Sequence, residues 1–265
     1  MSRIEGALRR LRAQGQKGLI AYVTAGDPDL KTTGRIIKAL AAVVDVIELG
    51  IPFSDPLADG PVIQRASKRA LASGTNIPKV LQMVSRVAAA VDVPLALMTY
   101  YNPVLRYGPE RFIRDSKQVG VDGVIVPDLP PEEGADFIEA ARRAGLDPIL
   151  FVAPTSTPER VRRVAKLARG FIYCVALTGT TGSDKGLSNT VQSVIGMVRR
   201  ETDVPVAIGF GIADAHRARR AARYADAVIV GTALLRRIEE AEPDQVPRLA
   251  ESFLGELRAA LREGA

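Results

Sequence analysis

The sequence has little of the chemistry that many functional sites require. Its 265 residues include one cysteine, Cys174, and one histidine, His216. A single cysteine excludes an intrachain disulfide and a cysteine-rich metal site, and a single histidine excludes a metal site built from several histidines. Aromatic residues make up 5% of the chain, so the stacking surfaces that bind single-stranded nucleic acids are scarce.

Long apolar runs are also missing. No stretch approaches the ~20 apolar residues that a membrane-spanning helix needs. The first 16 residues alternate charged and apolar side chains, lack the apolar core of a secretory signal, and predict a short amphipathic helix. We therefore expect a soluble, cytoplasmic protein that does not bind a membrane.

The formal net charge of +6 raises the possibility of a nucleic-acid partner. The basic residues, however, come as scattered pairs such as Arg142-Arg143 and Arg219-Arg220, in helical stretches that also hold acids and alanines. No basic tail is present. This pattern indicates solvated helix surfaces, and we expect no nucleic-acid binding.

Short β-branched runs alternate with longer segments of helical periodicity. The predicted strands are 19–24, 43–49, 94–100, 122–128, 148–154, 171–176, 205–211 and 226–231. Thr157 and Asp214 are predicted helix N-caps, and Pro130-Pro131 predicts a further helix start.

Strand-then-helix alternation indicates parallel strands joined by right-handed crossovers. Eight such units in this length are typical of a (β/α)₈ barrel, known as a TIM barrel. The alternative is a doubly wound open sheet, which usually carries a glycine-rich first turn, whereas here the first strand leads into "TAGDPD" with one glycine. We predict one (β/α)₈ domain over residues 1–265, with an additional N-terminal helix.

Glycines gather after three neighbouring predicted strands. They are Gly209 and Gly211 at the end of the seventh strand, Gly231 before Thr232 at the end of the eighth, and Gly179, Gly182 and Gly186 in the loop after the sixth. Glycines allow backbone N–H groups to approach an anion, and a helix N-terminus adds partial positive charge. This is where barrel enzymes commonly bind phosphate. Each turn could instead be only a tight connection.

Two acidic residues, one at the end of the second predicted strand and one in the loop after it, are candidate catalytic groups. Glu48 shares the parity of Val46, so it points into the barrel if Ile47 and Leu49 face the helices. A carboxyl group in a partly apolar barrel mouth has a raised pKa, which suits a group that donates and accepts a proton. Asp59 follows in a loop rich in proline and glycine. The alternative is a buried, hydrogen-bonded Glu48 and an Asp59 that serves only the turn.

Other catalytic side chains are missing from the strand ends. No lysine lies at the carboxyl end of a predicted strand, where a Schiff-base aldolase would need one. Cys174 has opposite parity to Tyr173 and is predicted to pack against the helices, while His216 is predicted to face solvent. The pattern favours acid–base chemistry on a phosphorylated metabolite, without a metal.

The stretch "ELGIPFSDPLADGPVIQRA" resembles the signature of the tryptophan synthase alpha chain family. Further matching stretches are "AYVTAGDPD", "LMTYYNPV", "GVDGVIVPDLPPEE", "LFVAPTST", "TGTTG", "AIGFGI" and "IVGTAL". They are collinear and cover nearly the whole chain.

This resemblance implies a lyase of L-tryptophan biosynthesis that cleaves indole-3-glycerol phosphate to indole and glyceraldehyde 3-phosphate. It implies no cofactor in this chain, and a pyridoxal-phosphate beta chain as partner in an α₂β₂ tetramer. Glu48 corresponds to the family's general acid–base, and Asp59 to the residue that stabilises the indole nitrogen.

The resemblance also implies the substrate contacts. The phosphate falls on Gly182, Gly211, Gly231 and Thr232. Tyr22, Tyr173, Phe210 and Ile229 line the indole site, and Thr181 touches the aspartate when the loops close. The chain departs from the family where Thr232 replaces an expected serine, which keeps the hydroxyl, and where loop six lacks an arginine before its first glycine.

Two alternatives stay open at this point. One is a stand-alone indole-releasing lyase without a beta chain. The other is a different phosphate-binding barrel enzyme, such as a phosphosugar isomerase. The pair Glu48 and Asp59 argues against this second alternative.

Overall fold

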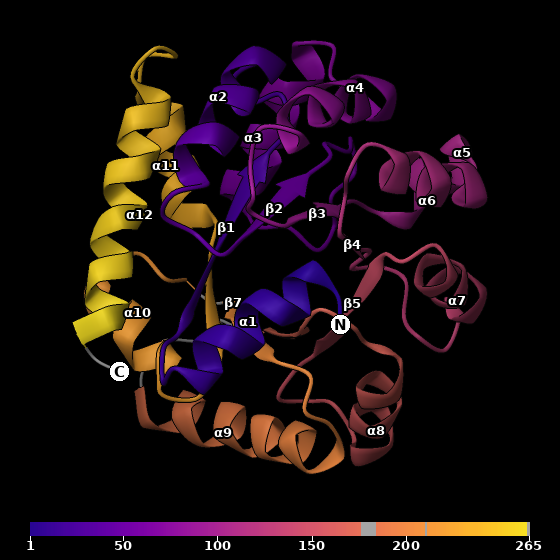
Figure 1. The fold of residues 1–265 in the computed structure, drawn as a ribbon, viewed down its shortest axis with the longest axis vertical. Coiled ribbons are helices and arrows are strands. Elements are labelled where there is room, and N and C mark those ends of the chain that lie inside the picture. The colour runs from indigo at the N-terminus through magenta and orange to yellow at the C-terminus, as the bar shows by residue number, and fades with distance from the viewer. Residues whose placement is uncertain (176–183, 210, 264–265) are drawn as a thin grey trace.

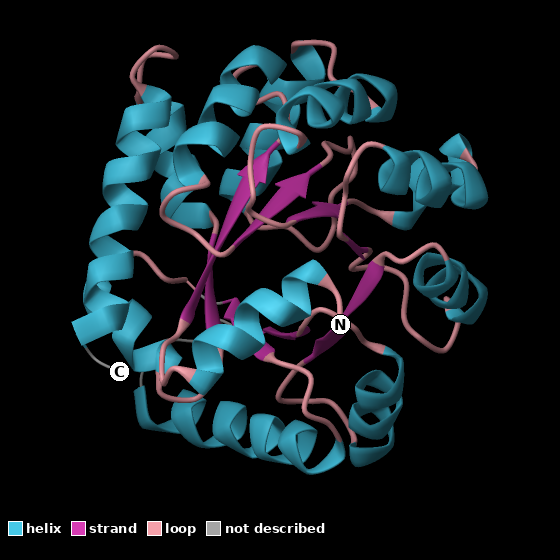
Figure 2. Ribbon diagram, viewed as in Figure 1, coloured by secondary structure: helices cyan, strands magenta, loops and turns pink. Residues whose placement is uncertain are grey.

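Eight parallel strands pair in chain order and close into a barrel. They are β1 (Gly18–Thr24), β2 (Val46–Gly50), β3 (Leu95–Met98), β4 (Gly123–Ile125), β5 (Asp147–Val152), β6 (Ile172–Val175), β7 (Val206–Gly209) and β8 (Ala227–Val230). The structure is a computed structural model, and it describes residues 1–175, 184–209 and 211–263. Figure 2 shows the strands enclosed by helices. The predicted (β/α)₈ barrel is confirmed, and the alternative of an open doubly wound sheet is excluded.

Helices follow the strands and cover the outside of the barrel (Figure 1). They are α1 (Arg3–Ala13), α2 (Leu30–Leu40), α3 (Pro61–Ala72), α4 (Ile77–Ala88), α5 (Tyr101–Tyr107), α6 (Pro109–Gln118), α7 (Ala135–Arg143), α8 (Pro158–Leu167), α9 (Asp184–Glu201), α10 (Ala215–Ala222), α11 (Thr232–Glu240) and α12 (Val246–Glu263). The additional N-terminal helix is therefore confirmed as α1.

The side chains of Thr157 and Asp214 accept hydrogen bonds from backbone N–H groups in the first turns of α8 and α10, as predicted. The predicted helix start at Pro130 is wrong, because α7 begins at Ala135. The residues before it form a turn in which Glu133 N donates to Pro130 O at 3.0 Å.

Helix α1 lies across one opening of the barrel (Figure 1). Its Ile4 and Leu8 are buried in one cluster with Ile20, Val46 and Ile125 from the strands. These contacts fill the end where the parallel strands begin. The end where the strands finish is left for the loops, and this is the end at which barrel enzymes place their sites.

Alternation along the strands sorts side chains between the barrel interior and the helices. Ile47 and Leu49 pack with the helices, whereas Val46 belongs to the interior cluster. Glu48 therefore points inward, as predicted. Cys174 is buried on the helix side and Tyr173 packs against the interior cluster, which also agrees with the prediction.

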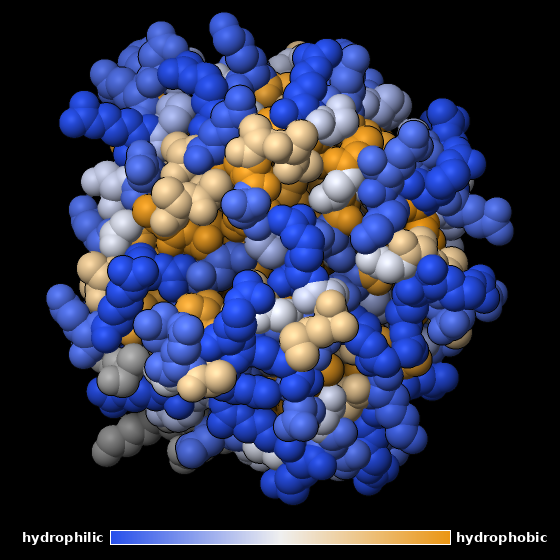
Figure 3. All heavy atoms as spheres, viewed as in Figure 1, coloured by the Kyte–Doolittle hydropathy of each residue, from blue (hydrophilic) through white to orange (hydrophobic). Residues whose placement is uncertain are grey.

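The outer surface is mostly hydrophilic on the face shown in Figure 3, with an apolar area in its upper part. His216 is exposed on α10, as predicted. Among the described residues, no helix is both long and apolar enough to cross a membrane.

Candidate active site

Glu48 is a buried carboxyl group that has no hydrogen-bond partner among the described residues. It is the third residue of β2, in register with Tyr22 of β1 and Ala96 of β3, and its exposed fraction is 0%. Neither Oε1 nor Oε2 has a partner. Burial alone raises the pKa of this carboxyl to about 8, because its charged form loses hydration and gains nothing in return. Glu48 is therefore mostly protonated at neutral pH.

Two tyrosines lie beside Glu48 in the barrel mouth. Desolvation is the main cause that raises the pKa values of Tyr22 and Tyr173, and the charge of Glu48 raises them further. Both rings occupy space that glycines on the next strand leave open. A Cβ atom on Gly50 would overlap the Tyr22 hydroxyl, and one on Gly209 would overlap that of Tyr173. Gly209, which the sequence places among phosphate-binding glycines, thus makes room for a tyrosine.

Asp59 approaches the mouth from the loop between β2 and α3. Its backbone N donates to Pro56 O at 3.0 Å, and Gln64 Nε2 donates to its carbonyl at 2.9 Å. Desolvation raises its pKa to about 6, and the neighbouring Tyr100 hydroxyl acts against this rise. Its charge in turn raises the pKa of Tyr22. Asp59 is therefore mostly ionised at neutral pH, close to a tyrosine that also interacts with Glu48.

Residues from β7 and β8 lie at the same end of the barrel. Gly211 has φ +45°, a left-handed conformation that a side chain rarely adopts. Gly231 is the N-cap of α11, Thr232 is its first residue, and Ile229 is buried in the interior cluster. The first N–H groups of a helix have no partner within it, and the nine-residue helix α11 directs them here.

The structure therefore brings together Glu48, Asp59, Tyr22 and Tyr173, with the backbone at Gly231 next to the Tyr22 ring. Thr181, Gly182 and Phe210 lie outside the described residues. Asp55 is exposed and hydrogen-bonded to Ser54, which accords with a part in loop structure.

The sequence interpretation missed several residues at this end. Tyr100 follows β3 with the parity of Ala96 and is 6% exposed, so the parity that places Glu48 also finds it. The hydroxyls of Thr24 and Thr99 are buried without a hydrogen-bond partner among the described residues. Arg217 Nη1 donates to Gly211 O at 3.2 Å and brings a positive charge to the proposed phosphate site. The predicted N-cap Asp214 gives the start of α10, but the sequence pattern does not show that the Arg217 side chain turns back to Gly211.

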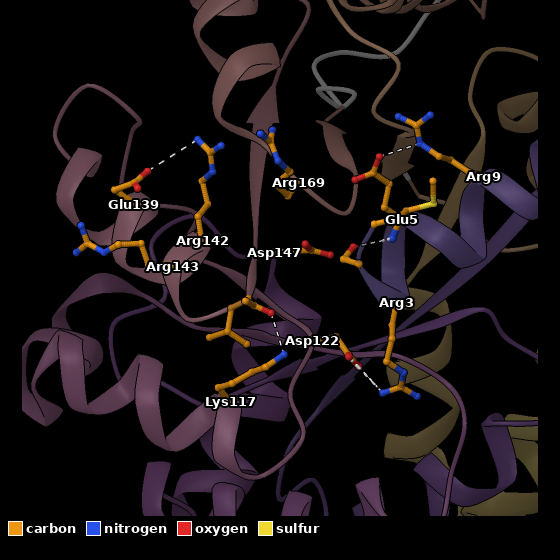
Figure 4. Close-up of a pocket in the computed structure, with 14 residues that line it drawn as sticks. Arg3, Glu5, Arg9, Lys117, Asp122, Glu139, Arg142, Arg143, Asp147 and Arg169 are labelled. Carbon is orange, nitrogen blue, oxygen red and sulfur yellow. Dashed lines mark hydrogen bonds and ion pairs between the residues drawn. The ribbon is translucent and has the colours of Figure 1, made fainter.

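A charged hollow of about 970 Å³ lies at the opposite end of the barrel (Figure 4). Its acids are largely paired: Arg3 with Asp122 at 3.0 Å and Arg9 with Glu5 at 2.8 Å. Asp147 is 4% exposed there, with burial raising its pKa to about 6. The paired charges make this hollow different from the barrel mouth.

The described residues contain no group of three or more His, Cys, Asp or Glu side chains that could bind a metal ion. Proton transfer by carboxyl groups is the chemistry that the open end of the barrel supports. The fold and this site define a barrel enzyme of the acid–base class.

Comparison with known proteins gives the family. The sequence model of the tryptophan synthase alpha chain family matches residues 8–261. The tryptophan synthase alpha chain of Geobacter sulfurreducens is 47% identical over 98% of this chain and 99% of its own, and that of Burkholderia multivorans is 48% identical over 98% and 97%. The chain belongs to the tryptophan synthase alpha chain family.

Solved structures agree. Tryptophan synthase subunit alpha from Legionella pneumophila superposes with a TM-score of 0.90 at 35% identity, over 99% of both chains. A ligand-free tryptophan synthase structure from M. tuberculosis gives 0.88 at 36% identity, over 99% of this chain and 100% of that one.

The activity is that of the family: a carbon–carbon lyase that cleaves indole-3-glycerol phosphate in tryptophan biosynthesis. The family uses no cofactor, and pyridoxal phosphate belongs to the beta chain. A different phosphate-binding barrel enzyme, such as a phosphosugar isomerase, is thereby excluded.

Proposed function

We propose that Glu48 is the general acid and base of this cleavage. The observation that carries the proposal is that both of its carboxyl oxygens are buried without a partner among the described residues. A structural glutamate at this depth would be expected to have hydrogen bonds, because an unpaired buried polar group costs free energy. Glu48 instead keeps its proton and both oxygens available for a ligand.

The reaction needs two proton transfers at one place. Protonated Glu48 donates its proton to C3 of the indole ring, which becomes an indoleninium cation. The Glu48 carboxylate then takes the proton of the hydroxyl on the adjacent glycerol carbon. That carbon becomes an aldehyde as the bond to C3 breaks, and the bonding electrons neutralise the cation. Glu48 ends protonated, so one group with a pKa of about 8 serves both transfers.

Asp59 has the complementary task in the proposal. Its pKa of about 6 leaves it ionised when Glu48 is still protonated. An ionised carboxylate beside the ring nitrogen stabilises the positive charge that forms when C3 is protonated. Two acids in different surroundings thus take different roles.

The remaining proposed residues bind the substrate. Ring contacts come from Tyr22, Tyr173, Phe210 and Ile229, of which three line the described barrel interior. Phosphate contacts come from Gly182, Gly211, Gly231 and Thr232, and the N-terminus of α11 supports this part. Thr181 would contact Asp59 when substrate is bound.

We further propose a beta chain as partner, in an α₂β₂ tetramer. Leu57, in the Asp59 loop, is 94% exposed and Leu105, on α5, is 58% exposed. The two segments meet where the Phe53 and Tyr100 rings lie 5.4 Å apart. Exposed large apolar side chains on two neighbouring segments favour a covered surface, whereas a stand-alone lyase would leave them in water.

An indole-release assay on indole-3-glycerol phosphate tests the catalytic proposal. Glu48→Gln should abolish release while equilibrium binding of the substrate stays within about threefold of wild type, because the amide keeps the shape of the carboxyl group. Turnover at the wild-type rate would rule out Glu48 as the acid–base group.

Size-exclusion chromatography with and without a beta chain tests the partner. The expected result is a complex that Leu57→Asp disrupts while the isolated chain keeps its fold. If the two chains do not coelute and the added chain does not change indole release, the result would favour the stand-alone lyase.

A further inference from the structure

Tyr100 connects the end of β3 to the loop that carries Asp59. It follows β3 with interior parity and is 6% exposed. Its ring lies 5.4 Å from that of Phe53, near the start of the loop. Its hydroxyl oxygen accepts a hydrogen bond from Ala58 N at 2.9 Å, near the end of the loop. One side chain therefore contacts the loop at both ends.

The geometry of a phenol decides what its proton does. A tyrosine hydroxyl has one hydrogen and accepts through its lone pairs. Since Ala58 N–H occupies an acceptor position, the single proton of Tyr100 is left to donate. The Asp59 carboxyl belongs to the residue after Ala58, and its interaction with the Tyr100 hydroxyl lowers the pKa of Asp59 against the effect of burial. In return, the charge of Asp59 helps to raise the pKa of Tyr100.

The other contacts of Asp59 are made by its main chain. Its backbone N donates to Pro56 O, and its carbonyl accepts from Gln64 Nε2. Neither bond fixes the rotamer of the carboxylate. Leu57, two residues earlier, is 94% exposed, so packing at the tip of the loop does not hold it either.

We propose that Tyr100 is a positioning residue, whose hydroxyl accepts from Ala58 N and so holds the loop with the Asp59 carboxylate in the orientation that the cleavage needs. The proposal rests on the role given to Asp59 above. It assigns Tyr100 no proton transfer to the substrate.

Tyr100→Phe tests the proposal because it removes the hydroxyl and keeps the ring against Phe53. The expected result is a kcat about tenfold lower, with KM changed less than about twofold, since the loop loses its bond from Ala58 N and the binding surface is kept. The acid limb of kcat/KM against pH should move upward by on the order of one unit, because an ionised Asp59 is less stable without the neighbouring hydroxyl.

Tyr107→Phe is the matched control. Tyr107 donates to Asp115 at 2.8 Å on the outer helices, so the same substitution there removes a tyrosine–aspartate hydrogen bond away from the barrel mouth. This control should leave kcat and the acid limb at their wild-type values.

A double variant distinguishes positioning from an independent effect. If Tyr100 acts through Asp59, Tyr100→Phe combined with Asp59→Asn is no slower than Asp59→Asn alone. The proposal would be overturned if the losses in kcat of the two single variants multiplied in the double variant. It would also be overturned if Tyr100→Phe left the acid limb in place while Asp59→Asn abolished it. If Asp59→Asn itself keeps the wild-type limb and rate, the role of Asp59 is wrong, and the proposal for Tyr100 falls with it.

Discussion

Glu48 and Asp147 are buried carboxyl groups at opposite ends of the same barrel, and their surroundings differ. Asp147 begins β5 at the end covered by α1, where burial raises its pKa to about 6. Ser2 and Lys117 act against this rise, and the acids Glu5 and Asp122 add to it. Glu48 lies at the open end with burial as the cause of its pKa of about 8. Within the part of the chain that the structure describes, one buried oxygen of Asp147 and both oxygens of Glu48 lack a hydrogen-bond partner. Burial and a raised pKa thus occur at both ends, but of the two groups Glu48 lies at the end where barrel enzymes place their sites.

The largest expected contrast is in turnover. Glu48→Gln should lower kcat for indole release by about 10³-fold or more, because the group that we propose as acid and base is lost. Asp147→Asn should stay within about twofold of wild type. Steady-state assays on both variants measure the contrast. Equal losses of kcat in the two variants would show that each buried carboxyl group affects turnover only through folding.

The next largest effect concerns the second acid at the open end. Asp59→Asn should lower kcat by about 10²-fold, since a neutral amide stabilises the cationic ring less than a carboxylate does. The acid limb near pH 6, set by the pKa of Asp59, should disappear from the profile, while the limb near pH 8, set by Glu48, stays. A profile that keeps both limbs would assign the acid limb to another group.

A smaller effect is expected from the glycine that makes room beside Glu48. Gly50→Ala places a methyl group where the Tyr22 hydroxyl lies, so the ring must shift in the mouth. We expect kcat/KM to fall about tenfold with a small loss of stability. Gly255→Ala, on α12, is the control, because a Cβ there meets open space. Unchanged kinetics in Gly50→Ala would mean that Tyr22 does not shape the substrate site.

The smallest expected effect is on stability, and pH separates the two ends. Both carboxyl groups have folded pKa values above the ordinary ones of 4.5 for Glu48 and 3.8 for Asp147. Each therefore contributes stability that is present below its ordinary pKa and lost as pH rises through its folded pKa.

Relative to wild type, Asp147→Asn should thus gain Tm between pH 3.8 and about 6, and Glu48→Gln between pH 4.5 and about 8. The gain for Glu48→Gln should be the larger, at roughly 5 °C. Thermal unfolding across this pH range measures it. A Glu48→Gln variant that is no more stable than wild type at pH 9 would contradict the unpaired burial of Glu48.

The sequence predicted the parts of this comparison that depend on local pattern. Period-two alternation placed Glu48 inside the barrel and Cys174 outside it, and both placements are confirmed. The assignment of residues 1–265 to a single domain stays a prediction, as do the roles of the site residues.

Features that depend on register and loop conformation were not predictable in the same way. The overlap of Tyr22 with Gly50 arises because the two strands pair at one particular offset. The bonds from Tyr100 to the Asp59 loop join residues about 40 positions apart, whose approach is set by the closed barrel. The pattern of Asp147 at the start of a strand gave no signal of its burial under α1.

The most direct test of the central claim is the protonation state of Glu48. Infrared difference spectra between wild type and Glu48→Gln, recorded as a function of pH in the absence of substrate, isolate the carbonyl stretch of its protonated carboxyl group. A band present at pH 7 that titrates with a midpoint of about 8 is the predicted result. A band already lost by pH 6, with a midpoint near the ordinary value of 4.5, would contradict it.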